Sequence, residues 1–162
     1  PPCALLIADL DHFKPINDTY GHLIGDDVLR AVGAALKAAV REPALLGRLG
    51  GEEFLVVLPG ADLQAARVAG ERIREAVAAV DASPWFKHRS LTVSVGVTVA
   101  QPGVDTVSSA LKRADEALYA AKEAGRNCVR TRELQLSLRL AAEHGVVRVP
   151  ETSLPAQSNA KL

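Results

Sequence analysis

Two pairs of acidic side chains stand where the sequence predicts that strands end. Asp9 and Asp11 close a short apolar run, and Glu52 and Glu53 lie between two further apolar runs. If these runs pair in one sheet, the four carboxylates converge at one edge of it. Carboxylate and carbonyl oxygens suit Mg²⁺, a hard cation that shares its remaining ligand positions with water and phosphate. The pattern therefore indicates metal-assisted chemistry on a phosphate compound.

Basic groups occur at matching places along the chain. Lys14 follows the first acidic pair, and Lys122 and Arg126 are four residues apart near the end of a helical segment, where we expect them on one helix face. Together these side chains could neutralise a triphosphate. The backbone N–H groups of His12 to Lys14, at the start of a predicted helix, would add an anion cradle.

Two further features suit a purine nucleotide. Asn17 and Asp26 offer an amide and a carboxylate, which together can accept from and donate to the edge of guanine. Gly50 and Gly51 precede the second acidic pair, and glycine lets a bulky anionic ligand approach the backbone closely.

Each feature alone has a plainer interpretation. An exposed Asp-x-Asp at the end of a strand is often a helix cap. A Gly-Gly pair between strands is usually only a turn. Lys122 and Arg126 near a helix C-terminus could simply interact with the helix dipole. The joint order and spacing of the features favour the nucleotide site.

The composition is that of an ordinary globular domain. Of 162 residues, 48% are hydrophobic and 23% charged, and 19 basic side chains balance 19 acidic ones. A net charge of zero provides no field that would attract nucleic acid, so no nucleic acid is expected as a partner. The two cysteines are too few for a disulfide framework, which favours the cytoplasm. No apolar run is long enough to cross a bilayer, which leaves open a membrane anchor elsewhere in a longer parent protein.

Hydrophobic periodicity predicts nine elements in the order β-α-α-β-β-α-β-α-β. The glycine-containing link before Phe54 predicts a β-hairpin. This order predicts an α/β sandwich, in which helices flank a central, mostly antiparallel sheet. The expected strands are 3–8, 45–49, 54–58, 91–100 and 127–130, and the expected helices are 11–21, 25–40, 61–80 and 107–124.

The last part of the chain, 131–162, has a different character. Alternating leucines are followed by an alanine-containing stretch and by a Pro/Ser/Asn-rich end. We expect one domain over 1–130 and a partly disordered linker over 131–162. Because the sequence opens directly on an apolar strand and contains no Met, we also expect it to be part of a longer protein.

The motifs in this order resemble the GGDEF family of diguanylate cyclases, in its GGEEF variant. The resemblance is specific and covers most of the expected domain. It implies a palm-like fold of the nucleotidyl-cyclase type. The matching stretches are 9–18 (D-x-D-x-F-K-x-x-N-D), 20–26 (Y-G-H-x-x-G-D), 50–54 (GGEEF), 93–97, 114–122 and 125–127.

The resemblance implies a catalytic set and a cofactor. Asp9 and Glu52 would ligate Mg²⁺ or Mn²⁺ with help from the Leu10 carbonyl, and Glu52 would also accept the proton of an attacking 3′-hydroxyl. Lys122 and Arg126 would hold the β- and γ-phosphates. Two GTP molecules would condense into cyclic di-GMP and pyrophosphate across a homodimer.

The resemblance also implies a set of groups that bind the substrate. Some would contact guanine, some would contact the phosphates, and two would leave room for them. The implied residues are Asn17, Asp26, Leu29, Lys14, His12, Phe13, Gly50 and Gly51.

The sequence departs from the family in two places. The L-T-x-L-x-N-R-R-like segment that precedes the first strand in the family is not in this sequence, and the regulatory domain is expected in a parent chain outside it. The R-x-x-D motif of the product-inhibition site is Arg41-Glu42-Pro43-Ala44 here, without its aspartate. We expect weakened cyclic di-GMP binding near Arg41, and the alternative is that Arg41 is a plain solvated residue.

A second function of a different class fits the same residues. A catalytically silent module could bind GTP or cyclic di-GMP as a receptor. The complete GGEEF motif favours the enzyme, and the altered inhibitory motif leaves room for the receptor. A turnover assay separates the two hypotheses.

Overall fold

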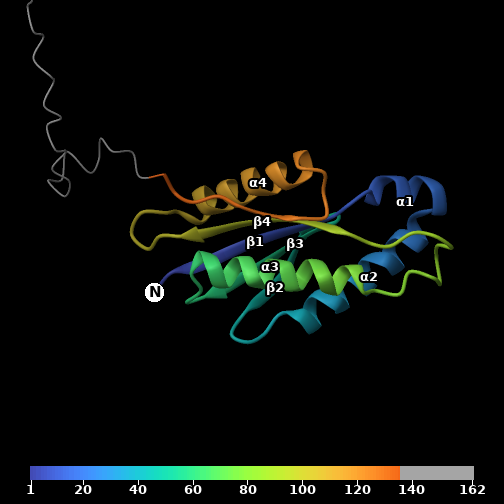
Figure 1. The fold of residues 1–162 in the computed structure, drawn as a ribbon, viewed down its shortest axis with the longest axis horizontal. Coiled ribbons are helices and arrows are strands. Elements are labelled where there is room, and N and C mark those ends of the chain that lie inside the picture. The colour runs from blue at the N-terminus through green and yellow to red at the C-terminus, as the bar shows by residue number, and fades with distance from the viewer. Residues whose placement is uncertain (136–162) are drawn as a thin grey trace, which may run out of the picture.

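The computed structural model describes residues 1–135, and its elements follow the predicted order (Figure 1). The expected linker lies outside the described residues from 136 onward. Within 1–135, no helix is long and apolar enough to cross a membrane. The strands are β1 (Cys3–Leu10), β2 (Leu45–Gly50), β3 (Glu53–Pro59), β4 (Val93–Ala100) and β5 (Val129–Thr131), and the helices are α1 (Phe13–Tyr20), α2 (His22–Ala39), α3 (Leu63–Ala78) and α4 (Val107–Glu123).

The five strands form one sheet in the order β2-β3-β1-β4-β5. β1 lies in the centre and pairs antiparallel with both β3 and β4, and β2 and β3 form the predicted hairpin. Only β5 runs parallel to its neighbour, β4. The predicted fold class, a mostly antiparallel sheet with flanking helices, is therefore confirmed.

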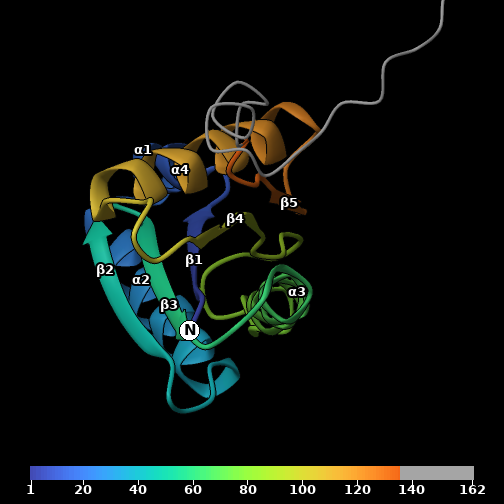
Figure 2. The same cartoon turned by 90° about the vertical axis from the view of Figure 1, so that its left-hand side faces the viewer.

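Side-chain alternation divides the sheet into two faces. Leu6 and Leu10 of β1 face the larger core, where α2 and α3 cover the sheet. Ile7 faces the other way and packs against Leu118 of α4. Figure 2 shows α4 on one side of the sheet and α2 and α3 on the other. Asp9 has the parity of Ile7, so its side chain belongs to the α4 face.

Helix α4 lies directly on the backbone of the sheet at Gly96. A Cβ atom built at this glycine would overlap the Leu118 backbone nitrogen and the Ala114 carbonyl oxygen. Both belong to the backbone of α4, which cannot move aside as a side-chain tip can. The absence of a side chain at Gly96 therefore sets how closely α4 approaches the sheet.

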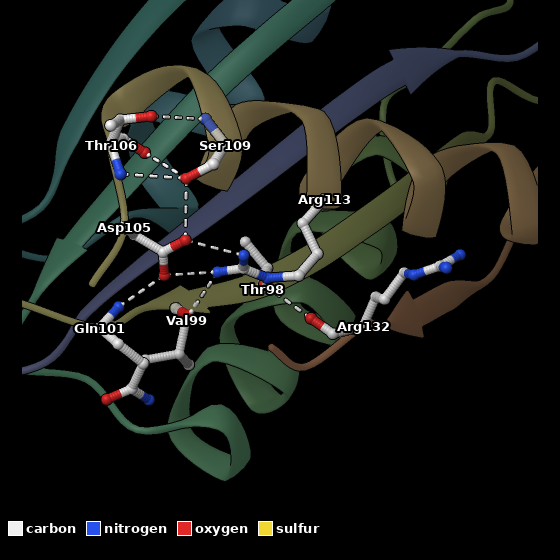
Figure 3. A network of polar contacts seen from close by, with 8 residues as sticks. All are labelled: Thr98, Val99, Gln101, Asp105, Thr106, Ser109, Arg113 and Arg132. Atoms are coloured by element: carbon white, nitrogen blue, oxygen red, sulfur yellow. Dashed lines mark hydrogen bonds and ion pairs between the residues drawn. The ribbon is translucent and has the colours of Figure 1, made fainter. Parts of the chain in front are cut away.

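A buried ion pair fixes the N-terminal half of α4 (Figure 3). Arg113 donates from both terminal nitrogens to the two carboxylate oxygens of Asp105, each at 2.8 Å, and from Nε to the Thr98 hydroxyl of β4 at 2.8 Å. The side chains of Arg113 and Asp105 are only 9% and 4% exposed. The guanidinium holds the pKa of Asp105 well below its usual range. The pair joins the helix to the strand on which it packs.

Hydrogen-bonding motifs define both ends of α4. At the start, Thr106 and Ser109 form a capping box, in which each side chain accepts from the backbone of the other. At the end, the Gly125 and Arg126 N–H groups donate to the Lys122 and Ala121 carbonyls at 3.3 and 3.0 Å. This pattern is a Schellman motif, and it confirms that Gly125 terminates the helix.

The Gly96 contact predicts a large effect for a very small substitution. Gly96→Ala should lower the free energy of unfolding by about 2 kcal/mol, because the added methyl group forces two backbone segments apart. Urea denaturation at neutral pH measures the change. Gly47→Ala is the matched control, since a Cβ at Gly47 of β2 meets no atom within 4 Å. Equal stability of the two variants would contradict this account of α4 packing.

The ion pair predicts a specific dependence of stability on pH. The pKa of Asp105 is lowered in the folded state, so its stabilising contribution is fully present above the unfolded pKa of about 4 and declines as the pH falls from that value towards the lowered folded pKa. Asp105→Asn should lower the free energy of unfolding by about 3 kcal/mol at pH 7, because it leaves a buried Arg113 without a counter-charge. The loss should be about 1 kcal/mol smaller at pH 3, because Asp105 of the unfolded chain is then largely protonated whereas the folded carboxylate is still ionised.

Urea denaturation at both pH values measures this difference. Asp27→Asn is the control, since Asp27 pairs with Arg30 on the exposed surface of α2, where an ion pair contributes little. A loss in Asp105→Asn that is the same at both pH values would show that the charge is not what stabilises this contact.

Candidate active site

The predicted acidic edge forms where β1 meets the β2–β3 hairpin. Asp9 lies opposite Glu53 in the antiparallel register, and the Leu10 N–H donates to the Glu52 carbonyl at 3.2 Å. β1 runs two residues further than the sequence predicted, so Asp9 is held within the strand. The structure thus brings Asp9, Leu10 and Glu52 together at one edge of the sheet.

Lys122 supplies the positive charge at this edge. Its Nζ lies 3.3 Å from the Asp9 carboxylate, and the Asp9 side chain is 8% exposed. Burial raises the pKa of Asp9 from 3.8 to about 6. Lys122 opposes that rise, and the nearby Glu52 and Glu53 add to it. The raised pKa of Asp9 therefore reflects its burial more than its charged neighbours.

The donor set fits a hard divalent cation. Two carboxylates and nearby backbone carbonyls offer only oxygen ligands. Among the described residues, no three His, Cys, Asp or Glu side chains gather in a way that could hold a metal ion. Mg²⁺ commonly takes one or two carboxylates and completes its shell with water and phosphate oxygens, which is the type of site that these residues could form.

The two glycines lie where the hairpin turns: Gly50 ends β2 and pairs with Glu53 of β3, and Gly51 is in the turn. Gly50 and Gly51 have φ angles of 152° and 50°, and nothing lies within 4 Å of a Cβ built at either position. Arg48 braces the turn by donating from Nε and one terminal nitrogen to the Gly51 carbonyl, at 2.8 and 2.5 Å. The sequence did not single out Arg48, because an arginine in an exposed strand carries no signal of the turn that it contacts.

The predicted guanine-binding residues lie on the first two helices. Asn17 of α1 packs against Gly25 of α2, where any Cβ would overlap its Oδ1 atom. That Oδ1 is buried and makes no hydrogen bond in the described structure. Asp26 and Leu29 line a pocket nearby with Phe54. A buried acceptor without a partner is costly, and this Oδ1 atom could accept a hydrogen bond from a ligand.

The start of α1 resembles the predicted anion cradle only in part. His12 caps the helix in a left-handed conformation, with φ 57°, and its side chain makes no capping bond. The N–H groups of Phe13 and Lys14 lie in the first turn, where a helix offers them no internal acceptor. The Lys14 side chain is 86% exposed and pairs with Asp18 at 3.2 Å.

The prediction that Lys122 and Arg126 share a helix face is wrong. Helix α4 ends at Glu123, and Arg126 follows Gly125 in a left-handed conformation with φ 65°. The spacing of four residues suggested a helical pair, but the Schellman motif reverses the chain between them. Arg126 is exposed and lies beyond the turn that begins at Lys122.

Asp11 also departs from the expected acidic cluster. Its Oδ1 atom accepts from Ser94, and its Oδ2 atom accepts from Thr92 and from the Asn127 N–H. Both oxygens are thus engaged by protein donors. Arg41, the residue of the altered inhibitory motif, is exposed where α2 joins β2, and it lines a separate surface pocket with Arg72.

Comparison with known proteins identifies the family. The model of the GGDEF domain of diguanylate cyclases matches residues 1–128. Diguanylate cyclase DgcP of Pseudomonas aeruginosa is 43% identical over 123 residues, which are 76% of this chain and 18% of that protein. Response regulator PleD of Caulobacter vibrioides is 44% identical over 133 residues, which are 79% of this chain and 29% of that protein. The chain therefore spans less than a third of these relatives.

Solved structures match the fold. The GGDEF domain of DgcB from Caulobacter crescentus, in complex with c-di-GMP, aligns with a TM-score of 0.71 at 36% identity, over 80% of this chain and 77% of that one. The active GGEEF domain of a diguanylate cyclase from Vibrio cholerae aligns with a TM-score of 0.72 at 33% identity, over 84% of this chain and 85% of that one. Sequence motifs, sheet order and these alignments agree, and this chain belongs to the GGDEF-domain family of diguanylate cyclases.

Proposed function

We propose that this chain is a diguanylate cyclase domain, which condenses two GTP molecules into cyclic di-GMP and releases two pyrophosphates. The observation that carries the proposal is the contact of buried Asp9 with Lys122, beside the backbone of Glu52. It provides oxygen ligands and a cation at one edge of the sheet, which is what transfer to an α-phosphate requires.

The reaction has two identical steps. The 3′-oxygen of one GTP attacks the α-phosphorus of the other, the bond from that phosphorus to the bridging oxygen breaks, and pyrophosphate leaves. Glu52 accepts the proton of the 3′-hydroxyl, and Lys122 and Arg126 offset charge on the β- and γ-phosphates. Repetition with the roles exchanged closes the ring.

The residues at this edge would hold Mg²⁺ or Mn²⁺. Asp9 and Glu52 would supply carboxylate oxygens, and Leu10 would supply its carbonyl. When bound, such an ion stabilises negative charge on the transferring phosphate. The placement of Asp9 beside the backbone of Glu52 and opposite Glu53, where oxygen ligands gather, supports this assignment.

Guanine recognition would fall to the groups between α1 and α2. The unpartnered Asn17 Oδ1 would accept from the purine edge, and Asp26 would accept from the ring N–H and the exocyclic amine. Leu29 would contact the apolar face of the base. His12, Phe13 and Lys14 would bind phosphate, and Gly50 and Gly51 would leave room for it.

Catalysis would require a homodimer. Each domain has one such site, so the attacking 3′-hydroxyl must come from the nucleotide of a second subunit. Two sites that face each other across a two-fold axis supply the geometry for both steps.

Glu52→Gln tests the catalytic assignment. The substitution keeps the shape of the side chain but removes a negative charge and the proton acceptor, so turnover should fall at least about a hundredfold. Pyrophosphate release and cyclic dinucleotide formation, measured with GTP and Mg²⁺, report the loss. Glu75→Gln makes the same change on the exposed surface of α3 and should leave turnover unaltered.

The same assay separates the enzyme from a receptor. A wild-type chain that binds GTP or cyclic di-GMP but releases no pyrophosphate, even at high protein concentration, would favour the silent receptor. Turnover by the wild type that survives in Glu52→Gln would contradict the mechanism while leaving an enzyme in place.

Dependence on protein concentration tests the dimer. The rate per site should rise with concentration and level off once the chain is dimeric, because a monomer can bind GTP but holds no second nucleotide to attack. Turnover and light scattering on the same samples measure both quantities. A constant rate per site in demonstrably monomeric protein would overturn the dimeric mechanism.

A further inference from the structure

Asp11 is a buried carboxylate with no place in the reaction proposed above. It is 5% exposed and follows directly after β1. Within residues 1–135 it makes no ion pair, and its charge is met by three hydrogen-bond donors. A buried carboxylate of this kind is costly unless it is hydrogen-bonded. The positions of the three donors therefore indicate the role of Asp11.

The three donors come from two distant parts of the chain. The Ser94 and Thr92 hydroxyls, at 2.7 and 2.8 Å, belong to β4 and the residue just before it. The third donor is the backbone N–H of Asn127, at 3.0 Å. Asp11 therefore connects the end of β1 to the start of β4 and to the turn that follows α4.

That turn has an unusual backbone and needs external support. Gly125, Arg126 and Asn127 have φ angles of 106°, 65° and 43°, and the left-handed region is unfavourable for the two residues that carry a Cβ. The Schellman bonds secure the turn on the helix side. Asp11 secures the Asn127 backbone, and Arg74 of α3 donates to the Asn127 side chain at 3.3 Å.

Arg126 lies between these two anchors. Its side chain makes no hydrogen bond or ion pair with any other described residue, so only its backbone fixes where it projects. On one side of it the chain leads back to Lys122, which contacts Asp9. On the other side is the residue that Asp11 holds.

We propose that Asp11 is a positioning residue for phosphate binding: by holding the Asn127 backbone, it keeps Arg126 beside the Lys122 end of α4. This inference rests on the proposed function, since it assumes that Arg126 contacts the β- and γ-phosphates of GTP. It assigns the two aspartates of the D-x-D motif different tasks, with Asp9 at the metal edge and Asp11 behind the phosphate-binding turn.

Asp11→Asn tests the proposal with little change in shape. The amide group would place N–H groups against donors from which the carboxylate accepts hydrogen bonds. The turn at Asn127 should therefore loosen. Isothermal titration calorimetry with Mg²⁺ should compare α,β-methylene-GTP, which cannot lose pyrophosphate, with GMP. We expect affinity for the triphosphate to fall about tenfold, as for the loss of a hydrogen bond to a charged group, and affinity for GMP to stay within about twofold.

A double-mutant cycle distinguishes positioning from general stabilisation. In an Arg126→Gln background, Asp11→Asn should cause no further loss of triphosphate affinity, because the group that it positions is gone. A tenfold loss that persists in that background, or equal losses for GMP and the triphosphate, would overturn the proposal. Asp81→Asn is the control, since Asp81 accepts only from Ser83 in its own exposed loop.

Two further measurements keep the outcomes separate. Amide hydrogen exchange at Asn127 should be faster in Asp11→Asn than in the wild type, and an unchanged rate would overturn the inference whatever the ligand data show. If Asp11→Asn does not fold, Thr92→Val removes one donor to the same oxygen and should shift affinity in the same direction. A wild-type chain that binds GMP as tightly as the triphosphate would instead contradict the proposed function.

Discussion

The antiparallel pairing of β1 with β3 concentrates negative charge at one edge of the sheet. It sets Asp9 opposite Glu53 and brings the Glu52 carbonyl to the Leu10 N–H. Like charges opposite each other weaken a strand pair, so the apolar remainder of β1, buried from Ala4 to Ala8, must hold the register. The acidic edge is thus stabilised by residues that take no part in chemistry.

Helix α4 brings the counter-charge to that edge, and its placement depends on contacts far from Lys122. Gly96 allows the helix to touch the sheet backbone, and the Asp105–Arg113 pair ties its first half to β4. Because a helix is stiff, these contacts determine where its last turn lies. Lys122 contacts Asp9 only because the whole helix is held at close range.

Other residues of the candidate site are held in positions that are unfavourable without a ligand or external support. Asn17 is confined by Gly25, and its acceptor atom is left without a partner in the described structure. At the Lys122 end of α4, the left-handed turn at Arg126 is likewise unfavourable by itself and is held by Asp11 and Arg74. Unpartnered and strained groups of this kind persist at sites where a ligand is expected to interact with them.

Local patterns were enough to predict the order of the nine elements, the hairpin at Gly50 and Gly51, the helix stop at Gly125 and the family, because turn residues, periodicity and motifs act over short stretches. They misplaced Arg126, since its spacing of four residues from Lys122 does not reveal that the chain reverses between the two. They also could not separate Asp9 from Asp11. Both carboxylates lie at the end of the same strand. Only the tertiary structure gives Asp9 a lysine from α4 and gives Asp11 three neutral donors, two from β4 and the residue before it and one from the turn after α4.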